Sequence, residues 1–271
     1  MKQGNLVALR NLLHISYGQI CTYLECSLKY QFQYVEKRAP ERASITLFFG
    51  SSMHKCLERY YTTLKLAGVP EQLSILTELF AEKMTIDLTS QKVPIIFKKE
   101  TPDLETAIEL GCSLLETFYN SIDMVGMEIL GVELPLSTMI TDDINLVGSI
   151  DLLLLDSQTQ NLIVVDTKTA AKAKTQADVD NDLQFSGYSH LLVENGFASK
   201  SDFTLCRLDV LRKLKTPKLE YYYTTRNLWQ RKRFSRIAKA VLAGIEHRVF
   251  IPTRSWLCSD CQFSNACAGW R

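Results

Sequence analysis

Asp151, Asp166 and Lys168 stand out beside two apolar runs in residues 146–170, which read LVGSIDLLLLDSQTQNLIVVDTKTA. Two apolar runs flank a polar run at residues 156–161, a pattern typical of two β-strands joined by a turn. Folding the strands symmetrically about that turn predicts a hairpin in which Asp151 faces Asp166. Lys168, two residues beyond Asp166, then points to the same face of its strand.

This hairpin would hold two carboxylates opposite each other with an ammonium group beside them. Like charges that face each other across two strands are destabilising, so an apolar hairpin should carry them only with a cation in between. A divalent metal with oxygen ligands is the natural candidate. Glu133, on a strand expected at residues 127–136, approaches the same face if that strand is antiparallel, but its register stays open.

The C-terminal stretch offers a second set of metal ligands. Cys258, Cys261 and Cys267 form a C-x2-C pattern followed by a third cysteine, which is typical of metal sites in intracellular proteins. Sulfur-only ligation suits zinc or an iron–sulfur cluster, and the pattern of three local cysteines plus a remote one favours the cluster. The candidates for the fourth ligand are Cys21, Cys26, Cys56, Cys112 and Cys206, with His247 as a further possibility.

Bulk composition narrows the class of protein. The 271 residues suffice for one large domain or two small ones, and a formal net charge of +1 means that any nucleic-acid surface must be local. No apolar run of about 18 residues is present, so no membrane span is expected. The N-terminus lacks a signal-peptide pattern, which predicts a cytoplasmic protein whose eight cysteines are not disulfides.

Periodicity predicts an α/β fold. A helix is expected at residues 16–35, where Ser16 and Gln19 fit a capping box, and another at 48–66, with His54 near its start. The second strand of the hairpin, with its apolar run at 162–165, is followed by a helix at 182–195 and a strand at 203–211, which indicates a crossover that extends the sheet. The remaining elements expected are helices at 71–88, 104–121 and 225–249 and a strand at 219–224.

Two helix faces carry polar side chains of interest. Gln184 and Tyr188 lie four residues apart and therefore share one face. The helix at 225–249 has six cations on its outer face and no acid before Glu246, which makes phosphate contact about as plausible as simple solvation. Arg231 and Arg233 are the candidates for DNA contact. The six cations are Arg226, Arg231, Lys232, Arg233, Arg236 and Lys239.

In their order along the chain, these motifs resemble the RecB-type branch of the PD-(D/E)XK nuclease superfamily, especially iron–sulfur members such as the AddB-type nuclease domain and the CRISPR-associated exonucleases. The resemblance extends from about Ser16 to Cys267. Its motifs are FGSSMHKCLE with His54, the G-x-x-D of Gly148 to Asp151, the D-x-K of Asp166 to Lys168, the Q-x-x-x-Y of Gln184 and Tyr188, and the cysteines.

The resemblance implies a fold and two metal centres. The fold is a central mixed β-sheet flanked by helices, the restriction-endonuclease-like core, in a single nuclease domain at 1–271 with a helical insertion at 67–125. Cys26 and the segment 250–271 would hold a [4Fe-4S] cluster. Cys26 fits better than Cys21 because aromatic residues follow it closely, although Ser27 stands where proline is frequent in the family.

The resemblance also implies roles for the catalytic residues. His54, Asp151 and Asp166 would bind Mg²⁺ or Mn²⁺, with the Val165 carbonyl completing the set. Lys168 would orient a water or stabilise developing charge. Gln184 and Tyr188 would border the site, where they contact the DNA backbone or orient Lys168.

The expected function is that of a metal-dependent DNA exonuclease in repair, recombination or DNA-end processing. Its substrate would be single-stranded DNA or DNA with a free end. No G-x-x-x-x-G-K-[ST] motif is present, so any unwinding would come from a helicase or recombination partner. The alternative is a catalytically silent DNA-binding or interaction module of a larger helicase–nuclease or CRISPR-type complex, and zinc remains the alternative to the iron–sulfur cluster.

Overall fold

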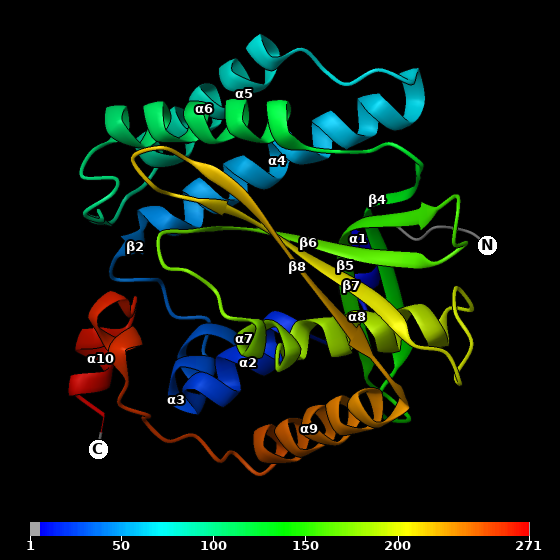
Figure 1. Cartoon of the computed structure of the whole chain (residues 1–271). Coiled ribbons are helices and arrows are strands. Elements are labelled where there is room, and N and C mark those ends of the chain that lie inside the picture. Colours follow the sequence, from blue (N-terminus) through cyan, green and yellow to red (C-terminus); the bar gives the residue numbers. More distant parts are fainter. Residues whose placement is uncertain (1–5, 271) are drawn as a thin grey trace.

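A mixed β-sheet between two layers of helices forms the centre of the computed structural model, which describes residues 6–270 (Figure 1). Within these residues, no helix has both the length and the apolar character needed to span a membrane. The strands of the sheet are β1 (His14–Ser16), β4 (Met127–Met139), β5 (Asn145–Asp156), β6 (Leu162–Ala170), β7 (Thr204–Arg212) and β8 (Lys218–Arg226).

Strand β5 has two successive neighbours along one of its edges. Its first residues, Asn145 to Val147, pair in parallel with β1, and its later residues, Leu152 to Leu155, pair antiparallel with β6. Its other edge pairs antiparallel with β4. Strand β7 then joins β6 in parallel and β8 joins β7 antiparallel. The predicted mixed sheet is confirmed, and residues 148–151 lie at a fork where β1 ends and β6 begins.

The hairpin of β5 and β6 has the predicted register but a shorter ladder. The Asp156 N–H donates to the Asn161 carbonyl at 3.0 Å, and the ladder runs from there to Leu152 opposite Val165. It ends one pair before Asp151 and Asp166, so the prediction that a ladder pairs these carboxylates directly is wrong. The reason is the fork, because β5 leaves β6 at this point.

Three long helices cover one face of the sheet and three others cover the opposite face (Figure 1). The first layer packs Phe49, Phe80 and Phe118 into a core against the sheet, and the second packs Phe185 and Phe234 into a separate core. The first layer consists of α4 (Ile45–Ala67), α5 (Leu73–Thr89) and α6 (Leu104–Ser121), and the second of α2 (Tyr17–Glu25), α8 (Leu183–Glu194) and α9 (Leu228–Glu246).

The predicted helix at residues 16–35 begins as expected but is broken. Its capping box forms, because the Ser16 N–H donates to Gln19 Oε1 at 2.7 Å and the Gln19 N–H to Ser16 Oγ at 3.3 Å. The helix ends at Cys26, whose backbone is extended. The reason is the C-terminal segment: the Leu28 N–H donates to the Ile251 carbonyl at 3.2 Å instead of continuing the helix.

Short elements complete the chain. The C-terminal pieces η2 and α10 lie beside α3 (Figure 1), which brings segments from both halves of the sequence together. The short elements are α1 (Leu6–Arg10), α3 (Ser27–Tyr30), the π-helical turn η1 (Gln31–Val35), β2 (Ala43–Ser44), β3 (Ile95–Ile96), α7 (Gln176–Asp180), the 3₁₀ turn η2 (Trp256–Asp260) and α10 (Ser264–Ala268).

A bidentate ion pair is buried on β7. Arg207 donates to Asp209 through Nε at 2.7 Å and through Nη2 at 2.9 Å, and the two side chains are 4% and 0% exposed. Burial raises the pKa of the Asp209 carboxyl to about 6, and the Arg207 guanidinium opposes this rise. The charge on Asp209 therefore depends on its partner.

We expect Arg207→Met to destabilise the protein by about 3–5 kcal/mol at pH 7, because it leaves the Asp209 carboxylate buried and unpaired. The loss should be smaller at pH 5, where the raised pKa of Asp209 lets the carboxyl protonate and the uncompensated charge disappears. Urea denaturation at both pH values measures this. The double variant Arg207→Met/Asp209→Leu should recover part of the loss, and equal stability of the single variant and wild type would contradict the prediction.

Candidate active site

Helix α4 delivers His54 to the fork of the sheet. The Ser44 hydroxyl caps the helix by accepting from the Thr46 N–H, and the neighbouring Met53 is buried in the core. His54 Nδ1 lies 3.4 Å from Asp151 Oδ2 and 4.0 Å from Glu133 Oε1. Burial and then the nearby Lys168 ammonium lower the pKa of His54. The imidazole is therefore neutral at neutral pH, the form in which it can bind a metal.

Irregular backbone turns Glu133 and Asp151 toward this histidine. Ile150 belongs to the core under α8 and Leu152 to the core under α4, although side chains two residues apart in a regular strand share a face. Strand β5 therefore twists at Asp151. In the neighbouring strand β4, Glu133 has a φ of 43°, a left-handed conformation that is rare for a residue other than glycine.

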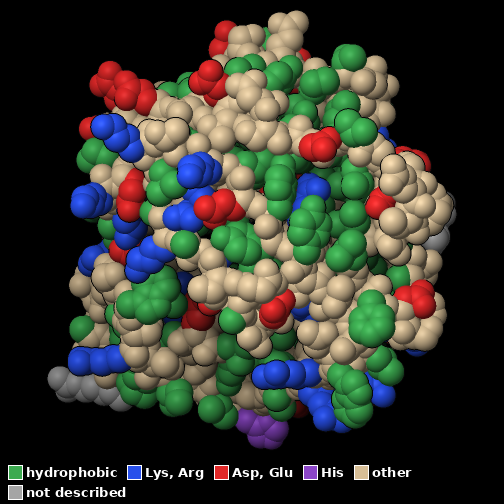
Figure 2. Space-filling model, in the orientation of Figure 1, with side chains coloured by type: hydrophobic (Ala, Val, Ile, Leu, Met, Phe, Trp, Pro, Cys, Tyr) green, Lys and Arg blue, Asp and Glu red, His purple; other side chains and the backbone are tan. Residues whose placement is uncertain are grey.

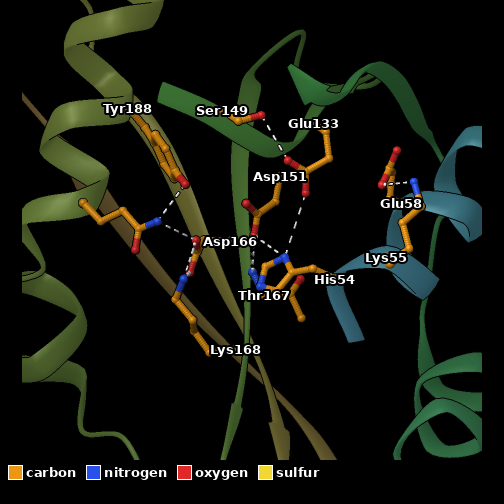
Figure 3. Close-up of polar contacts among 11 residues, drawn as sticks. His54, Lys55, Glu58, Glu133, Ser149, Asp151, Asp166, Thr167, Lys168 and Tyr188 are labelled. Atoms are coloured by element: carbon orange, nitrogen blue, oxygen red, sulfur yellow. Dashed lines mark hydrogen bonds and ion pairs between the residues drawn. The ribbon is translucent and has the colours of Figure 1, made fainter. Parts of the chain in front are cut away.

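Hydrogen bonds fix both carboxylates in these positions. The Ser149 hydroxyl donates to Glu133 Oε2 at 3.0 Å, and the Thr167 N–H donates to Asp151 Oδ2 at 3.2 Å (Figure 3). One atom each from His54, Glu133 and Asp151 forms a group whose members all lie within 4.8 Å of one another. These three residues are the set that the described part of the chain offers to a single metal ion.

Asp166 and Lys168 lie together on the next strand, as predicted. Lys168 Nζ donates to Asp166 at 2.9 Å, and Gln184 Nε2 donates to the same carboxylate at 2.9 Å (Figure 3). Gln184 Nε2 also lies 2.7 Å from the Tyr188 hydroxyl, so the predicted pair on α8 meets the site from the opposite layer. Asp166 is not a member of the 4.8 Å group with His54.

The electrostatics of the site favour a bound cation. Burial raises the pKa of Asp151 to about 6 and that of Asp166 to about 7. The Lys168 ammonium opposes both shifts. The Glu133 carboxylate further raises the pKa of Asp151, and the Asp151 carboxylate further raises that of Asp166. Burial lowers the pKa of Lys168, but the two aspartates outweigh this effect and leave the pKa raised. Ionising both carboxyl groups therefore costs free energy that a divalent ion would offset, and carboxylate donors suit hard divalent ions such as Mg²⁺ or Mn²⁺.

The predicted cluster cysteines line one cavity. Cys26, Cys258, Cys261 and Cys267 surround a cavity of ≈ 660 Å³, next to the small core that contains Phe263. Cys21 lies elsewhere, beside the Tyr17 hydroxyl, and burial raises the pKa of its thiol. The structure thus separates the two candidates for the fourth ligand and places Cys26 with the C-terminal three.

The four thiols share this cavity without forming a compact group of ligands. Among residues 6–270, no three cysteine sulfurs all lie within 4.8 Å of one another.

The structure contradicts the prediction that Arg231 contacts DNA. Arg231 is 3% exposed and donates to the Lys200 carbonyl at 2.6 Å, the Asp202 carbonyl at 3.1 Å and the Ser189 hydroxyl at 3.2 Å. It ties α9 to the loop before β7 and has no face toward solvent. Arg233, the other candidate, is exposed on the outer side of the helix.

Comparison with known proteins gives one family and one similar fold. The family model described as PD-(D/E)XK nuclease superfamily matches residues 14–268. No curated protein matches the chain. A solved structure from Eubacterium rectale, named only as a candidate exonuclease, shares 12% identity and a TM-score of 0.60 over 100% of this chain and 92% of its own. A second structure, named SSO0001, has 13% identity and a TM-score of 0.31 over 98% and 97% of the two chains.

Glu133 is the residue that sequence reasoning placed least well. The register of β4 decides whether it reaches Asp151, and that register includes an irregularity between Ile129 and Gly131. No pattern in the local sequence predicts this β-bulge. The available signal was only that an acidic residue stands on a strand next to the hairpin.

We expect Mn²⁺ to raise the melting temperature of the protein through the group of His54, Glu133 and Asp151. An ion at about 100 times its Kd stabilises the folded state by about 2.7 kcal/mol. Glu133→Gln should weaken this thermal shift, because it removes one anionic ligand. Differential scanning calorimetry with and without EDTA measures it.

Glu58→Gln is the matched control, since Glu58 lies on α4 near the site but pairs with Lys55 at 2.9 Å (Figure 3). Its Mn²⁺-induced shift should change less than that of Glu133→Gln, because Glu58 acts on Glu133 only through its charge. An unchanged shift in Glu133→Gln would remove this residue from the ligand set.

Proposed function

Because this chain belongs to the PD-(D/E)XK nuclease superfamily, we propose that it is a divalent-metal-dependent deoxyribonuclease that digests DNA from a free end. One observation carries the proposal: the His54, Glu133 and Asp151 group lies beside the ion pair of the buried Asp166 and the partly exposed Lys168. The exonuclease assignment follows the name of the Eubacterium rectale protein, whose fold is similar. Single-stranded DNA or a duplex end is the proposed substrate.

His54, Asp151 and Asp166 are the proposed ligands of Mg²⁺ or Mn²⁺, with the Val165 carbonyl as a further donor. Glu133 is added to this set because its carboxylate lies 4.0 Å from the same imidazole. The chemistry that such an ion supplies when bound is neutralisation of charge on the scissile phosphate and acidification of a nearby water.

Lys168 acts on the reacting phosphate as a fixed positive charge. The carboxylates of Asp166 and Asp151 raise its pKa and keep it protonated, so it can donate a hydrogen bond to the attacking water or to a phosphate oxygen but cannot accept a proton. A charge held in place in this way stabilises the negative charge that develops during hydrolysis. This supports an electrostatic role over that of a general base.

Gln184 and Tyr188 serve as positioning residues in the proposal. Gln184 donates to Asp166 Oδ1 at 2.9 Å, the same oxygen that accepts from Lys168. It thereby limits the rotation of the carboxylate, and Tyr188 holds the amide of Gln184 in turn. Both side chains border the site on the α8 side, where the DNA backbone would pass.

We further propose a [4Fe-4S] cluster on Cys26, Cys258, Cys261 and Cys267. The cavity that all four cysteines line supports a shared metal centre, and the pattern of three C-terminal cysteines plus a remote one favours the cluster over zinc. Its role would be structural. It would fasten the break after α2 to the C-terminal segment, which already contacts that break through the Ser27 hydroxyl and the Ile251 N–H at 2.8 Å.

The proposed setting is DNA repair, recombination or the processing of DNA ends in the cytoplasm, together with a helicase or recombination protein that unwinds the substrate. The alternative of a catalytically silent module has no supporting observation in residues 6–270, because the family's acidic, histidine and lysine positions are all filled. It remains one outcome of the activity test.

We expect Asp166→Ala and Lys168→Ala each to reduce DNA degradation by about 10²–10³-fold, the range found when one charge-stabilising group is removed. The assay follows end-labelled single- and double-stranded DNA, labelled at either end, with Mg²⁺, Mn²⁺ or EDTA. Glu58→Gln should retain full activity. Wild-type protein that binds DNA but degrades none with either metal would establish the silent module instead.

The purified protein should be brown, with broad absorbance near ~400 nm from thiolate-to-iron charge transfer. Cys26→Ser should lose this absorbance and its iron, whereas Cys21→Ser should keep both, because Cys21 does not line the cavity. Iron and zinc analysis accompanies the spectrum. A colourless, folded, zinc-loaded protein would overturn the cluster assignment.

A further inference from the structure

The outer face of α9 combines an exposed tryptophan with a row of cations. Trp229, Lys232, Arg233, Arg236 and Lys239 are all exposed. Their spacing of three, four, seven and ten residues from Trp229 places them in one stripe along the helix. The opposite side of α9 packs its apolar residues into the core under the sheet. The stripe is therefore not the apolar face of the helix left without a partner.

The positive charge of this stripe is not neutralised within residues 6–270. None of the side chains of Lys232, Arg233, Arg236 and Lys239 takes part in an ion pair there. The only acid on α9 is Glu246, its last residue. In a chain with a net charge of +1, such a stripe is a local concentration of positive charge.

Trp229 adds a flat apolar surface to these charges. Its side chain is 72% exposed, and Lys232 Nζ lies 5.8 Å from the centre of its ring. A hollow of ≈ 360 Å³ is lined by Trp229, Gln230, Lys232, Arg233 and Arg236. Basic and hydrophobic side chains lie next to one another along the lower edge of the molecule, over α9 (Figure 2).

We propose that the outer face of α9 binds single-stranded DNA outside the active site. An unpaired base stacks on Trp229, and the cations that follow it contact successive phosphates. Exposed aromatic rings beside cations are how proteins bind single strands without reading their sequence. Charge complementarity selects this occupant, because the stripe offers four cations and a stacking surface but no continuous apolar strip for a partner helix or a membrane.

This inference deepens the proposed nuclease function and rests on it for the identity of the polymer. Helix α9 packs against α8 on the side away from the sheet (Figure 1), whereas Gln184 and Tyr188 of α8 face the catalytic aspartate. A strand on α9 is thus a part of the substrate distant from the bond being cut. The surface acts as an anchor for long substrates.

The length of the anchor limits how many phosphates it contacts, and so determines how strongly DNA binding depends on salt. Trp229 and Lys239 are separated by about 15 Å along the helix axis, at about 1.5 Å per residue. Each phosphate that a single strand contacts contributes about −0.7 to the slope of log K against log salt. Removing two of these contacts should therefore make the slope shallower by about 1.4.

Binding is tested on the Asp166→Ala protein in EDTA, with a fluorescein-labelled 30-nucleotide oligothymidylate and anisotropy as the readout. Lys232→Glu/Arg236→Glu should weaken binding at least about tenfold near 0.1 M salt and make the salt slope shallower by at least about 1.4. Trp229→Ala should weaken binding at least about fivefold with the slope unchanged, since stacking involves no counterions. Thermal melts should match those of the parent, because all three side chains are exposed.

Lys92→Glu is the control, an exposed lysine outside α9 that should leave binding unchanged. In the catalytically intact protein, the α9 variants should raise KM for the 30-nucleotide strand but not for a six-nucleotide strand, which does not reach the anchor. Unchanged binding in both α9 variants overturns the anchor while leaving the nuclease proposal intact. If the α9 variants lose binding to another protein but keep their affinity for DNA, the anchor is also overturned. A wild-type protein that neither binds nor cleaves DNA would contradict the nuclease proposal itself.

Discussion

The proposed catalytic centre depends on the fork in which β5 exchanges β1 for β6 as its neighbour. A strand edge pairs with one strand at a time, so between Val147 and Leu152 this edge of β5 has no ladder partner. Asp151 lies in that interval and accepts from the Thr167 N–H through its side chain. Side chains from several elements meet at this gap in the backbone ladder. The Asp151 carboxylate there accepts a hydrogen bond of the kind that a strand carbonyl accepts elsewhere in the sheet.

Burying acidic groups at this fork costs stability, and the surrounding residues offset only part of the cost. The pKa values of Asp151 and Asp166 are raised to about 6 and about 7, chiefly by burial. Lys168 and Gln184 both bind Asp166, whereas Glu133 brings a further negative charge close to Asp151. A divalent cation between these carboxylates would offset the remaining charge imbalance.

Patterns local in sequence predicted the parts of this site that depend on local geometry. The turn at 156–161 fixed the register of the hairpin, period two put Lys168 beside Asp166, and helical spacing brought Gln184 to Tyr188. Contacts between distant segments decided the rest. The break at Cys26 is due to Ile251, and Arg231 is buried because Ser189, Lys200 and Asp202 accept its hydrogen bonds. No periodicity within α9 distinguishes that arginine from Arg233.

Helix α8 connects the two surfaces proposed to hold DNA. One side of it presents Gln184 to Asp166, and the other packs closely against α9. A Cβ at Gly187 would lie 3.0 Å from the ring of Phe234, and Ser189 accepts from Arg231 at 3.2 Å. Buried polar contacts and tight packing leave little freedom between the two helices. A strand held on the outer face of α9 therefore lies at a fixed offset from the catalytic centre, so that the spacing between anchor and cut is set by the thickness of two packed helices.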